Sequence, residues 1–285
     1  MNYKHLVLSG GSWKGLYMLG AIDFFLKEKY IKFNLLETIY ATSVGSLIAT
    51  LIALKIEWNT IIQYFINVPI KQLDNLNLDI CLSMFNDCGI LDKTFFIKLL
   101  GSLFKSKYLD IETITLNDFY KYSNIELNFF AIEFETMNTI NFNHNDHPDI
   151  KLLDVLYSSC TFPYLFKPSK LNDKIYLDGG INVHYPSKYC LEKHKNEEIF
   201  GIYIRTKSCL ESNLDNMLNF GISLIYKLVF TNQMENLEKL NNQFIIDTEG
   251  KMVNTIVELV KNKNLREKII NEGRRLSKIY LNNGI

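Results

Sequence analysis

The feature that most constrains the fold is a strand-to-helix pattern that occurs twice within the first sixty residues. Residues 5–9 and 35–42 are short β-prone apolar runs, and each ends in small residues. Apolar residues at helical spacing follow in both cases, over residues 15–30 and from 44 to about 58. Strand, helix, strand and helix in so short a stretch predict an α/β fold built on a parallel sheet with right-handed crossovers.

The rest of the chain continues this alternation without a break. Helices are predicted over residues 116–120 and 152–160, and strands over 126–134, 139–142, 174–177 and 199–204. From about residue 214 the pattern is mostly helical. Because no repeat, low-complexity tract or linker interrupts the chain, a single domain over residues 1–285 is expected.

The amino-acid composition limits what kind of protein this is and what it can bind. A hydrophobic content of 47% with 13% aromatic residues fits a folded globular protein. Lys plus Arg and Asp plus Glu both number 31, so no overall field attracts nucleic acid. No signal peptide or membrane-spanning run is found, and five cysteines without metal-type spacing indicate a reducing, cytoplasmic compartment. The cysteines are Cys81, Cys88, Cys160, Cys190 and Cys209.

Ser43 lies at the turn between the second predicted strand and its helix. A serine on such a turn presents its hydroxyl outward, beside helix N–H groups that favour developing negative charge. The usual nucleophile elbow is G-x-S-x-G, and Gly45 fits its last position while Ala41 occupies its first. The alternative interpretation is a plain strand-turn-helix with small residues at the turn.

A glycine-rich loop joins the first predicted strand to the first helix and contains Gly10, Gly11, Ser12, Lys14 and Gly15. The loop matches neither a P-loop nor G-x-G-x-x-G. Successive backbone N–H groups entering a helix, with positive potential from Lys14, suit an oxyanion hole. A glycine turn needed only for close packing is the alternative.

Asp178 ends the predicted strand 174–178 and precedes Gly179 and Gly180. An aspartate at the carboxyl end of a strand lies in the crevice where α/β sheets bind ligands. Taken alone, Asp-Gly-Gly is also a common turn.

The order of G-G-x-x-K-G, x-T-S-x-G and D-G-G resembles the patatin-like phospholipases, which are serine lipid acyl hydrolases. Residues 16–22, 115–120 with 127–136, 158–163 with Pro168, and Asn182 with Pro186 also match the family. The resemblance covers about residues 4–205. It implies a three-layer α/β/α fold with a mainly parallel central sheet, followed here by a helical region over 214–285.

The resemblance also implies a mechanism without a metal or a cofactor. Ser43 attacks the ester carbonyl of a phospholipid or another acyl lipid, and Asp178 accepts the hydroxyl proton. Backbone amides of Gly11 and Ser12 stabilise the oxyanion, while Gly10 shapes the loop. Burial of Asp178 is expected to raise its pKa toward neutrality. Transient peripheral contact with a membrane is expected, and Gly45, Gly179 and Gly180 support the turns.

Two residues depart from the family pattern. Ala41 replaces the first glycine of the elbow, and Ser12 replaces the third glycine of the loop. A Ser–Asp–His triad is the alternative to the dyad, because His184 follows Ser43 and Asp178 in the chain order of α/β-hydrolases. His184 lies only six residues after Asp178, which favours a role in lining the pocket or in packing.

Three segments have two interpretations each. Residues 57–110 form either a lid or lipid-facing wall, or ordinary core helices. Residues 251–280, with eight basic and three acidic side chains, form either a lipid-seeking amphipathic helix or terminal helices with a solvated basic face. His144 and His147 are expected to lie in a polar surface loop rather than at a metal.

The predicted activity is phospholipase A-type hydrolysis of fatty-acyl esters. The alternatives are an acyltransferase or thioesterase that uses the same dyad, and a catalytically inactive lipid-binding or interaction module.

Overall fold

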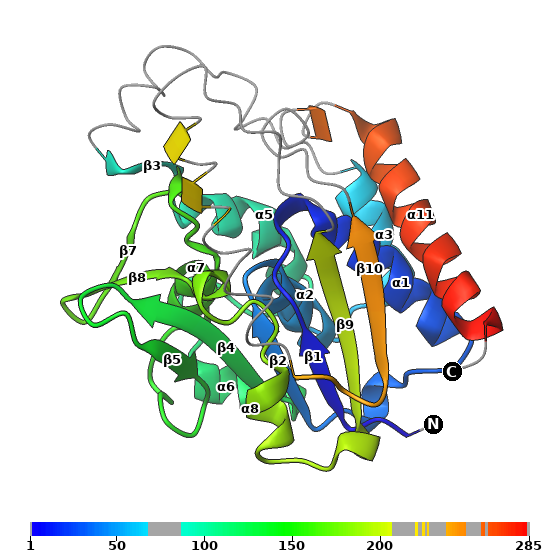
Figure 1. Cartoon of the computed structure of the whole chain (residues 1–285). Helices are drawn as coiled ribbons and strands as arrows, with labels where there is room; N and C mark the ends of the chain where they lie inside the picture. The colour runs from blue at the N-terminus through cyan, green and yellow to red at the C-terminus, as the bar shows by residue number, and fades with distance from the viewer. Residues whose placement is uncertain are drawn as a thin grey trace.

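The computed structural model of the chain describes residues 2–67, 87–206, 220–221, 224–225, 227, 238–248, 258–259 and 262–283 (Figure 1). The strands are β1 (His5–Leu8), β2 (Thr38–Thr42), β3 (Gly89–Leu91), β4 (Glu126–Glu133), β5 (Thr139–Phe142), β6 (Tyr164–Phe166), β7 (Ser169–Leu171), β8 (Lys174–Asp178), β9 (Ile199–Thr206) and β10 (Gln243–Thr248). The helices are α1 (Gly15–Lys27), α2 (Val44–Ala53), α3 (Trp58–Asn67), α5 (Thr94–Lys105), α6 (Leu116–Ser123), α7 (Leu152–Cys160), α8 (Ser187–Leu191) and α11 (Lys263–Asn282).

Within these residues, eight strands form a central sheet in the order β10-β9-β1-β2-β4-β8-β7, with β5 also paired to β4. The strands from β10 to β4 are all parallel, whereas β5 and β8 run antiparallel to β4. Strands β1 and β2 are buried at every position, which explains why they read as near-continuous apolar runs. The predicted α/β fold with a mainly parallel central sheet is therefore confirmed.

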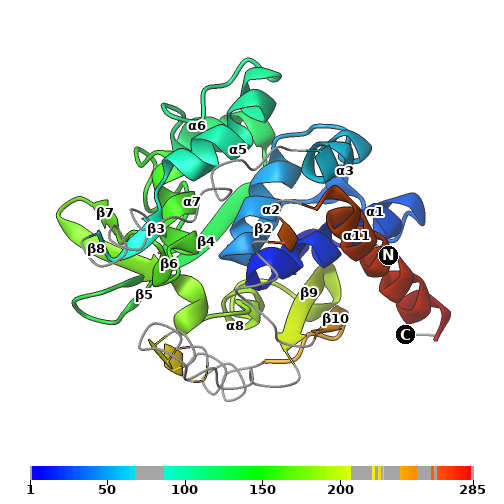
Figure 2. The same ribbon diagram turned by 90° about the horizontal axis from the view of Figure 1, so that it is seen from above.

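The two faces of the sheet are covered very unequally. Helices α1, α2, α3 and α7 lie on one face, and the five-residue helix α8 lies on the other (Figure 2). On β2, Ile39 and Ala41 point into the large aliphatic and aromatic core on the first face. Tyr40 points to the second face, where it joins a smaller cluster with Tyr185 and Tyr203.

Helix α11 packs along α1, although the two helices are far apart in sequence (Figure 1). Arg274 on α11 donates from Nε to the Asp23 carboxylate of α1 at 2.6 Å, and Lys27 Nζ lies 2.8 Å from the same oxygen. Arg266 is buried and donates from Nε to the carbonyl oxygen of Ile66 at 3.1 Å. Several basic side chains of the predicted amphipathic segment are thus engaged within the protein.

Some boundaries differ from those expected. The helix expected from residue 44 to about 58 ends earlier, because α2 stops at Ala53, Lys55 has a φ of 54°, and Trp58 already begins α3. The C-terminal region expected to be mostly helical contains the strand β10, which pairs along its whole length with β9. No helix in the described ranges is long and apolar enough to cross a membrane.

In the segment 57–110, helices α3 and α5 contribute buried side chains such as Phe65, Phe96 and Leu100 to the large core. These two helices therefore pack as ordinary core elements. The lid or lipid-facing wall predicted for this segment falls partly on residues 68–86, which lie outside the described residues.

Candidate active site

Strands β2 and β8 meet end to end along one edge of β4. Thr42 at the end of β2 pairs with Phe130, and Asp178 at the end of β8 pairs with Ala131, the next residue of β4. Both of these β4 residues also pair with β5, which must occupy the opposite edge. The carboxyl ends of two oppositely directed strands therefore face each other, and this brings Ser43 and Asp178 together.

Asp178 reaches Ser43 from a strand that is antiparallel to β4. The prediction placed the aspartate at the carboxyl end of a strand, in the crevice where α/β sheets bind ligands. Strand β8 is antiparallel to β4, so Asp178 approaches Ser43 from the opposite direction. The pairing register on β4 sets the position of Asp178.

The side chains of the two residues form a direct hydrogen bond. Ser43 Oγ donates to Asp178 Oδ2 at 2.6 Å, and the backbone N–H of Gly180 donates to Asp178 Oδ1 at 2.7 Å. Asp178 is only 3% exposed. Burial raises the pKa of Asp178 from 3.8 to about 6, against the lowering effect of the two hydrogen bonds. A carboxyl with this pKa suits a general base that works near neutral pH.

Ser43 has an unusual backbone conformation, with φ 55° and ψ −125°. For a residue other than glycine, such a conformation costs about 1–3 kcal/mol and persists only where the surroundings enforce it. Close packing of α2 on β1 is part of this enforcement, because a Cβ at Gly45 would lie 2.6 Å from the carbonyl oxygen of Leu8. Ala41 has no positive φ, so alanine fits the position of the missing elbow glycine.

Two buried serines flank the elbow and were not identified from the sequence as part of the site. Ser159, on α7, accepts a hydrogen bond from the backbone N–H of Ser43 at 3.0 Å. Its Oγ also lies 2.9 Å from Ser46 Oγ, and Ser46 Oγ donates to the carbonyl oxygen of Ala41 at 3.1 Å. In the sequence, Ser159 stands out only as part of residues 158–163, which resemble the family, and nothing in that resemblance indicates a contact with Ser43.

The glycine-rich loop lies beside Ser43. A Cβ at Gly10 would be 3.5 Å from Ser43 Cβ, and the Gly10 N–H donates to the carbonyl oxygen of His184 at 2.9 Å. Gly11 has a φ of 152° and Ser12 a φ of 54°, a range that favours glycine, so Ser12 bears strain where the family has glycine. Within the described part of the chain, the N–H groups of Gly11 and Ser12 have no acceptor. These two amides are therefore free to bind an anion.

Lys14 and Gly15 complete the predicted loop. Lys14 is buried, and its Nζ donates to Thr206 Oγ1 at the end of β9 at 2.7 Å. Burial lowers the pKa of Lys14 from 10.5 to about 8. Its ammonium is thus directed to β9 rather than hydrogen-bonded to Ser43 or Asp178. Gly15 begins α1.

His184 is not hydrogen-bonded to either member of the pair. Its Nε2 lies 3.1 Å from the carbonyl oxygen of Ile204, an acceptor, so Nε2 carries the proton and donates. Burial lowers the pKa of His184 from 6.5 to about 4. The imidazole contacts the loop at Gly10 and the turn at Gly180. The geometry agrees with a packing role.

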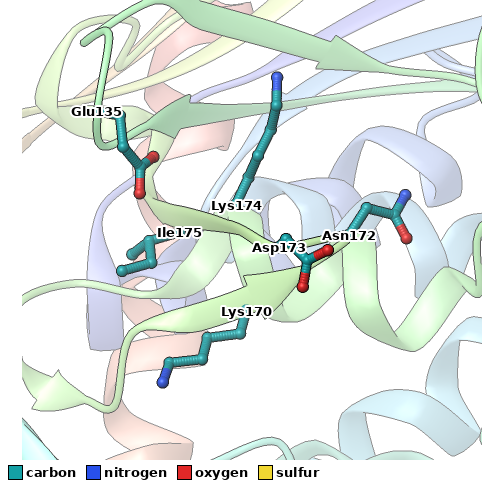
Figure 3. A pocket seen from close by; sticks show the side chains of 6 residues that line it. All are labelled: Glu135, Lys170, Asn172, Asp173, Lys174 and Ile175. Carbon is teal, nitrogen blue, oxygen red and sulfur yellow. The ribbon is translucent and has the colours of Figure 1, made fainter.

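Other groups considered from the sequence lie elsewhere. The His144 ring stacks on Tyr120 with centroids 3.6 Å apart, and the His147 ring packs on Phe142. In the described ranges no group of three or more His, Cys, Asp or Glu side chains is placed to hold a metal. A polar surface pocket lies at the β7–β8 hairpin (Figure 3), and neither Ser43 nor Asp178 is among its lining residues. Its lining residues are Glu135, Lys170, Asn172, Asp173, Lys174 and Ile175.

The chain is similar to known proteins in sequence and in fold. Over 200 residues the chain is 30% identical to Probable lipid hydrolase 463L of Invertebrate iridescent virus 6, across 68% of this chain and 66% of that protein. Over 185 residues it is 24% identical to Uncharacterized protein R571 of Acanthamoeba polyphaga mimivirus, across 64% of this chain and 60% of that protein. The chain thus matches less than two thirds of the length of either relative.

The fold resembles that of VipD from Legionella pneumophila, with a TM-score of 0.50 and 16% sequence identity over 96% of this chain and 67% of that one. At this identity the likeness concerns the fold alone. The model of the Patatin-like phospholipase family matches residues 6–186, which is more than half of the chain and includes Ser43 and Asp178. The chain belongs to the patatin-like phospholipase family of lipid hydrolases.

Proposed function

We propose that this protein is a serine esterase of the phospholipase A type that cleaves fatty-acyl esters of phospholipids through a Ser43–Asp178 dyad. The observation that carries the proposal is the 2.6 Å hydrogen bond from Ser43 Oγ to Asp178 Oδ2. The acceptor is a buried carboxyl with a pKa of about 6, which is deprotonated at neutral pH and able to take a proton there.

In the acylation step, Ser43 Oγ attacks the carbonyl carbon of the ester as its proton passes to Asp178 Oδ2. The carbonyl π-bond electrons move to oxygen and give a tetrahedral oxyanion. The intermediate collapses with cleavage of the bond between the carbonyl carbon and the alkoxy oxygen. Asp178 returns the proton to the leaving oxygen, so a lysophospholipid departs and the acyl group remains on Ser43.

In the deacylation step, a water molecule attacks the acyl carbon and gives one proton to Asp178. Collapse of the second tetrahedral intermediate breaks the bond to Ser43 Oγ, which regains that proton from Asp178. The products are a free fatty acid and the original enzyme. One carboxyl thus acts alternately as base and acid.

The oxyanion of each intermediate is assigned to the backbone amides of Gly11 and Ser12. Both amides lack acceptors in the described part of the chain, and they directly follow Gly10, which lies beside Ser43. The first turn of α2, which begins at Val44, adds the positive end of a helix dipole at the nucleophile. Removal of one such donor commonly costs about 10²–10³ in kcat.

Two exposed apolar side chains on the turn that follows β4 support contact of the protein with an aggregated lipid surface. Phe134 and Met137 are 52% and 48% exposed on the turn between β4 and β5. The turn is tied to the segment after Asp178, because Asn182 Nδ2 donates to the carbonyl oxygen of Met137 at 3.1 Å. We assign transient peripheral contact with lipid to this turn.

The test is fatty-acid release from a panel of phospholipid vesicles, together with labelling of Ser43 by a fluorophosphonate. We expect release by the unmodified protein, an adduct on Ser43, and neither with Ser43→Ala. An absence of the adduct in folded protein would exclude the esterase and leave an inactive lipid-binding module. Transfer of the acyl group to an added alcohol or thiol in preference to water would instead indicate an acyltransferase.

A further inference from the structure

We infer that Ser159 is a positioning residue that holds the Ser43 elbow in its reactive conformation through a directed chain of hydrogen bonds. The inference deepens the proposed function and rests on it. Ser159 belongs to α7, a helix that follows Ser43 by more than a hundred residues and supplies neither the nucleophile nor the base. It acts on the reaction through the backbone of the elbow.

The direction of each hydrogen bond follows from the number of available protons. The Ser43 N–H can only donate, so Ser159 Oγ accepts there. Ser46 Oγ donates its single proton to the carbonyl oxygen of Ala41, because a carbonyl cannot donate. In the remaining 2.9 Å contact Ser159 must therefore be the donor and Ser46 the acceptor. The chain runs from the Ser43 N–H through Ser159 and Ser46 to the Ala41 carbonyl.

This chain connects the backbone on both sides of the strained residue. Ala41 lies two positions before Ser43 in β2, and the Ser43 amide begins the turn into α2. Ser159 and Ser46 are fully buried, and each hydroxyl both donates and accepts one hydrogen bond. Without Ser159 Oγ the Ser43 N–H loses its acceptor and Ser46 Oγ loses its donor. Fewer hydrogen bonds then keep the Ser43 backbone at its strained φ of 55°, so it relaxes more easily.

Relaxation of the elbow moves Ser43 Oγ relative to Asp178. The hydrogen bond between them lowers the pKa of Asp178 against the effect of burial, so its loss raises that pKa further. Among the described residues, two titratable side chains face this carboxyl: Cys160, next to Ser159 on α7, and His184, whose imidazole lies beside the turn that follows Asp178 and stays neutral. Burial keeps the Cys160 thiol protonated by raising its pKa. A change at Ser159 is therefore expected to appear as a shift of the carboxyl titration as well as a loss of rate.

The matched pair of variants is Ser159→Ala and Ser158→Ala. Ser158 is the preceding residue of α7 and equally buried, but its hydroxyl bonds to the Asp154 carbonyl oxygen and Ser169 Oγ, away from the elbow. With a soluble short-chain ester, we expect Ser159→Ala to lower kcat about 10- to 100-fold with little change in KM. The acid limb of its pH–rate profile moves to higher pH, whereas Ser158→Ala leaves that limb in place.

A second pair of variants distinguishes loss of the Ser159 hydroxyl from a change in side-chain packing at this position. Thr and Val have the same shape, so Ser159→Thr should retain most of the rate that Ser159→Val loses. Carbon-13 NMR of the Asp178 carboxyl, assigned with Asp178→Asn, should show a higher pKa in Ser159→Ala than in the unmodified protein.

Five outcomes decide the inference. The expected combination of lost kcat, shifted titration and rescue by Thr supports it. Equal behaviour of Ser159→Ala and Ser158→Ala, or equal rates for the Thr and Val variants, overturns it while the esterase stands. An unchanged carboxyl titration in Ser159→Ala also overturns it. An unmodified protein that neither hydrolyses ester nor labels at Ser43 overturns the proposed function, and this inference with it.

Discussion

Asp178 and Asp23 are equally buried, at 3% exposure each, but they lie in opposite electrostatic surroundings. Asp23, on α1, is paired with Lys27 and with Arg274 of α11. Among the described residues, Asp178 accepts hydrogen bonds from a serine hydroxyl and a peptide N–H, and neither carries a charge. Neutral hydrogen-bond donors leave a buried carboxylate able to take up a proton, whereas cations compensate its charge through ion pairs that hold neighbouring elements together.

The largest expected difference between the two aspartates is in activity. Asp178→Asn removes the proton acceptor and should lower kcat for ester hydrolysis by about 10²–10⁴. Asp23→Asn, on the α1–α11 contact, should leave kcat within about threefold. Initial-rate kinetics on a soluble ester measure both. A large loss in both variants would mean that the assay reports folding rather than chemistry.

Stability should respond in opposite directions. The folded-state pKa of Asp178, about 6, lies above its unfolded value of 3.8. The folded protein therefore binds the proton more tightly, and ionisation of Asp178 costs stability as pH rises through 4 to 6. Asp178→Asn removes this cost, so we expect a gain of about 1–3 kcal/mol at pH 8 that shrinks toward pH 4.

The same substitution at Asp23 leaves Arg274 and Lys27 without their shared carboxylate, and should lose about 1–3 kcal/mol at pH 8. Denaturant unfolding at several pH values measures both variants. If Asp178→Asn were less stable than the unmodified protein at pH 8, the ionised Asp178 carboxylate could not be lowering the free energy of unfolding.

Asp178 and Asp23 should also differ in their influence on the pH dependence of kcat/KM, by a smaller factor than in their influence on kcat. Because only ionised Asp178 accepts a proton, kcat/KM should fall about tenfold for each pH unit below its pKa of about 6. Asp23→Asn should leave this acid limb unchanged. A limb centred near 4 would show that another group governs the rate.

Among the side chains around Ser43 and Asp178, the smallest effect is expected at His184. Its Nε2–H is engaged with the Ile204 carbonyl, and its low pKa leaves it neutral. His184→Ala should therefore retain activity within about tenfold and keep the acid limb in place. A loss as large as that of Asp178→Asn would favour a triad over the dyad.

The sequence was sufficient to predict most strands of the central sheet, namely β1, β2, β4, β5, β8 and β9. Strands β1 and β2 are buried on both faces and end in small residues, so their apolar runs were easy to recognise. Strands β3, β6 and β7 have only three residues each, which is too few for a periodic pattern. Strand β10 lies among helical patterns and is defined by its pairing with β9, a contact that local sequence does not encode.

The candidate site was predicted by residue identity but not by its supporting contacts. Ser43 and Asp178 occur in recognisable motifs, whereas Ser159 is an ordinary polar residue of a helix until α7 is placed against the elbow. The sequence showed that Ala41 and Ser12 depart from the family pattern. Only backbone geometry reveals that Ser12 adopts a positive φ and Ala41 does not.

The end-to-end meeting of β2 and β8 on β4 also has a consequence for how such a protein can change. Thr42, the residue before Ser43, pairs with Phe130 of β4, and Asp178 pairs with the next β4 residue, Ala131. Insertions in the loops between these strands leave that pairing unchanged, so the loops can vary in length as long as α2 and α7, which support the Ser43 turn, keep their places. A single-residue deletion at the centre of β4, in contrast, would shift one strand end against the other and turn a side chain to the wrong face.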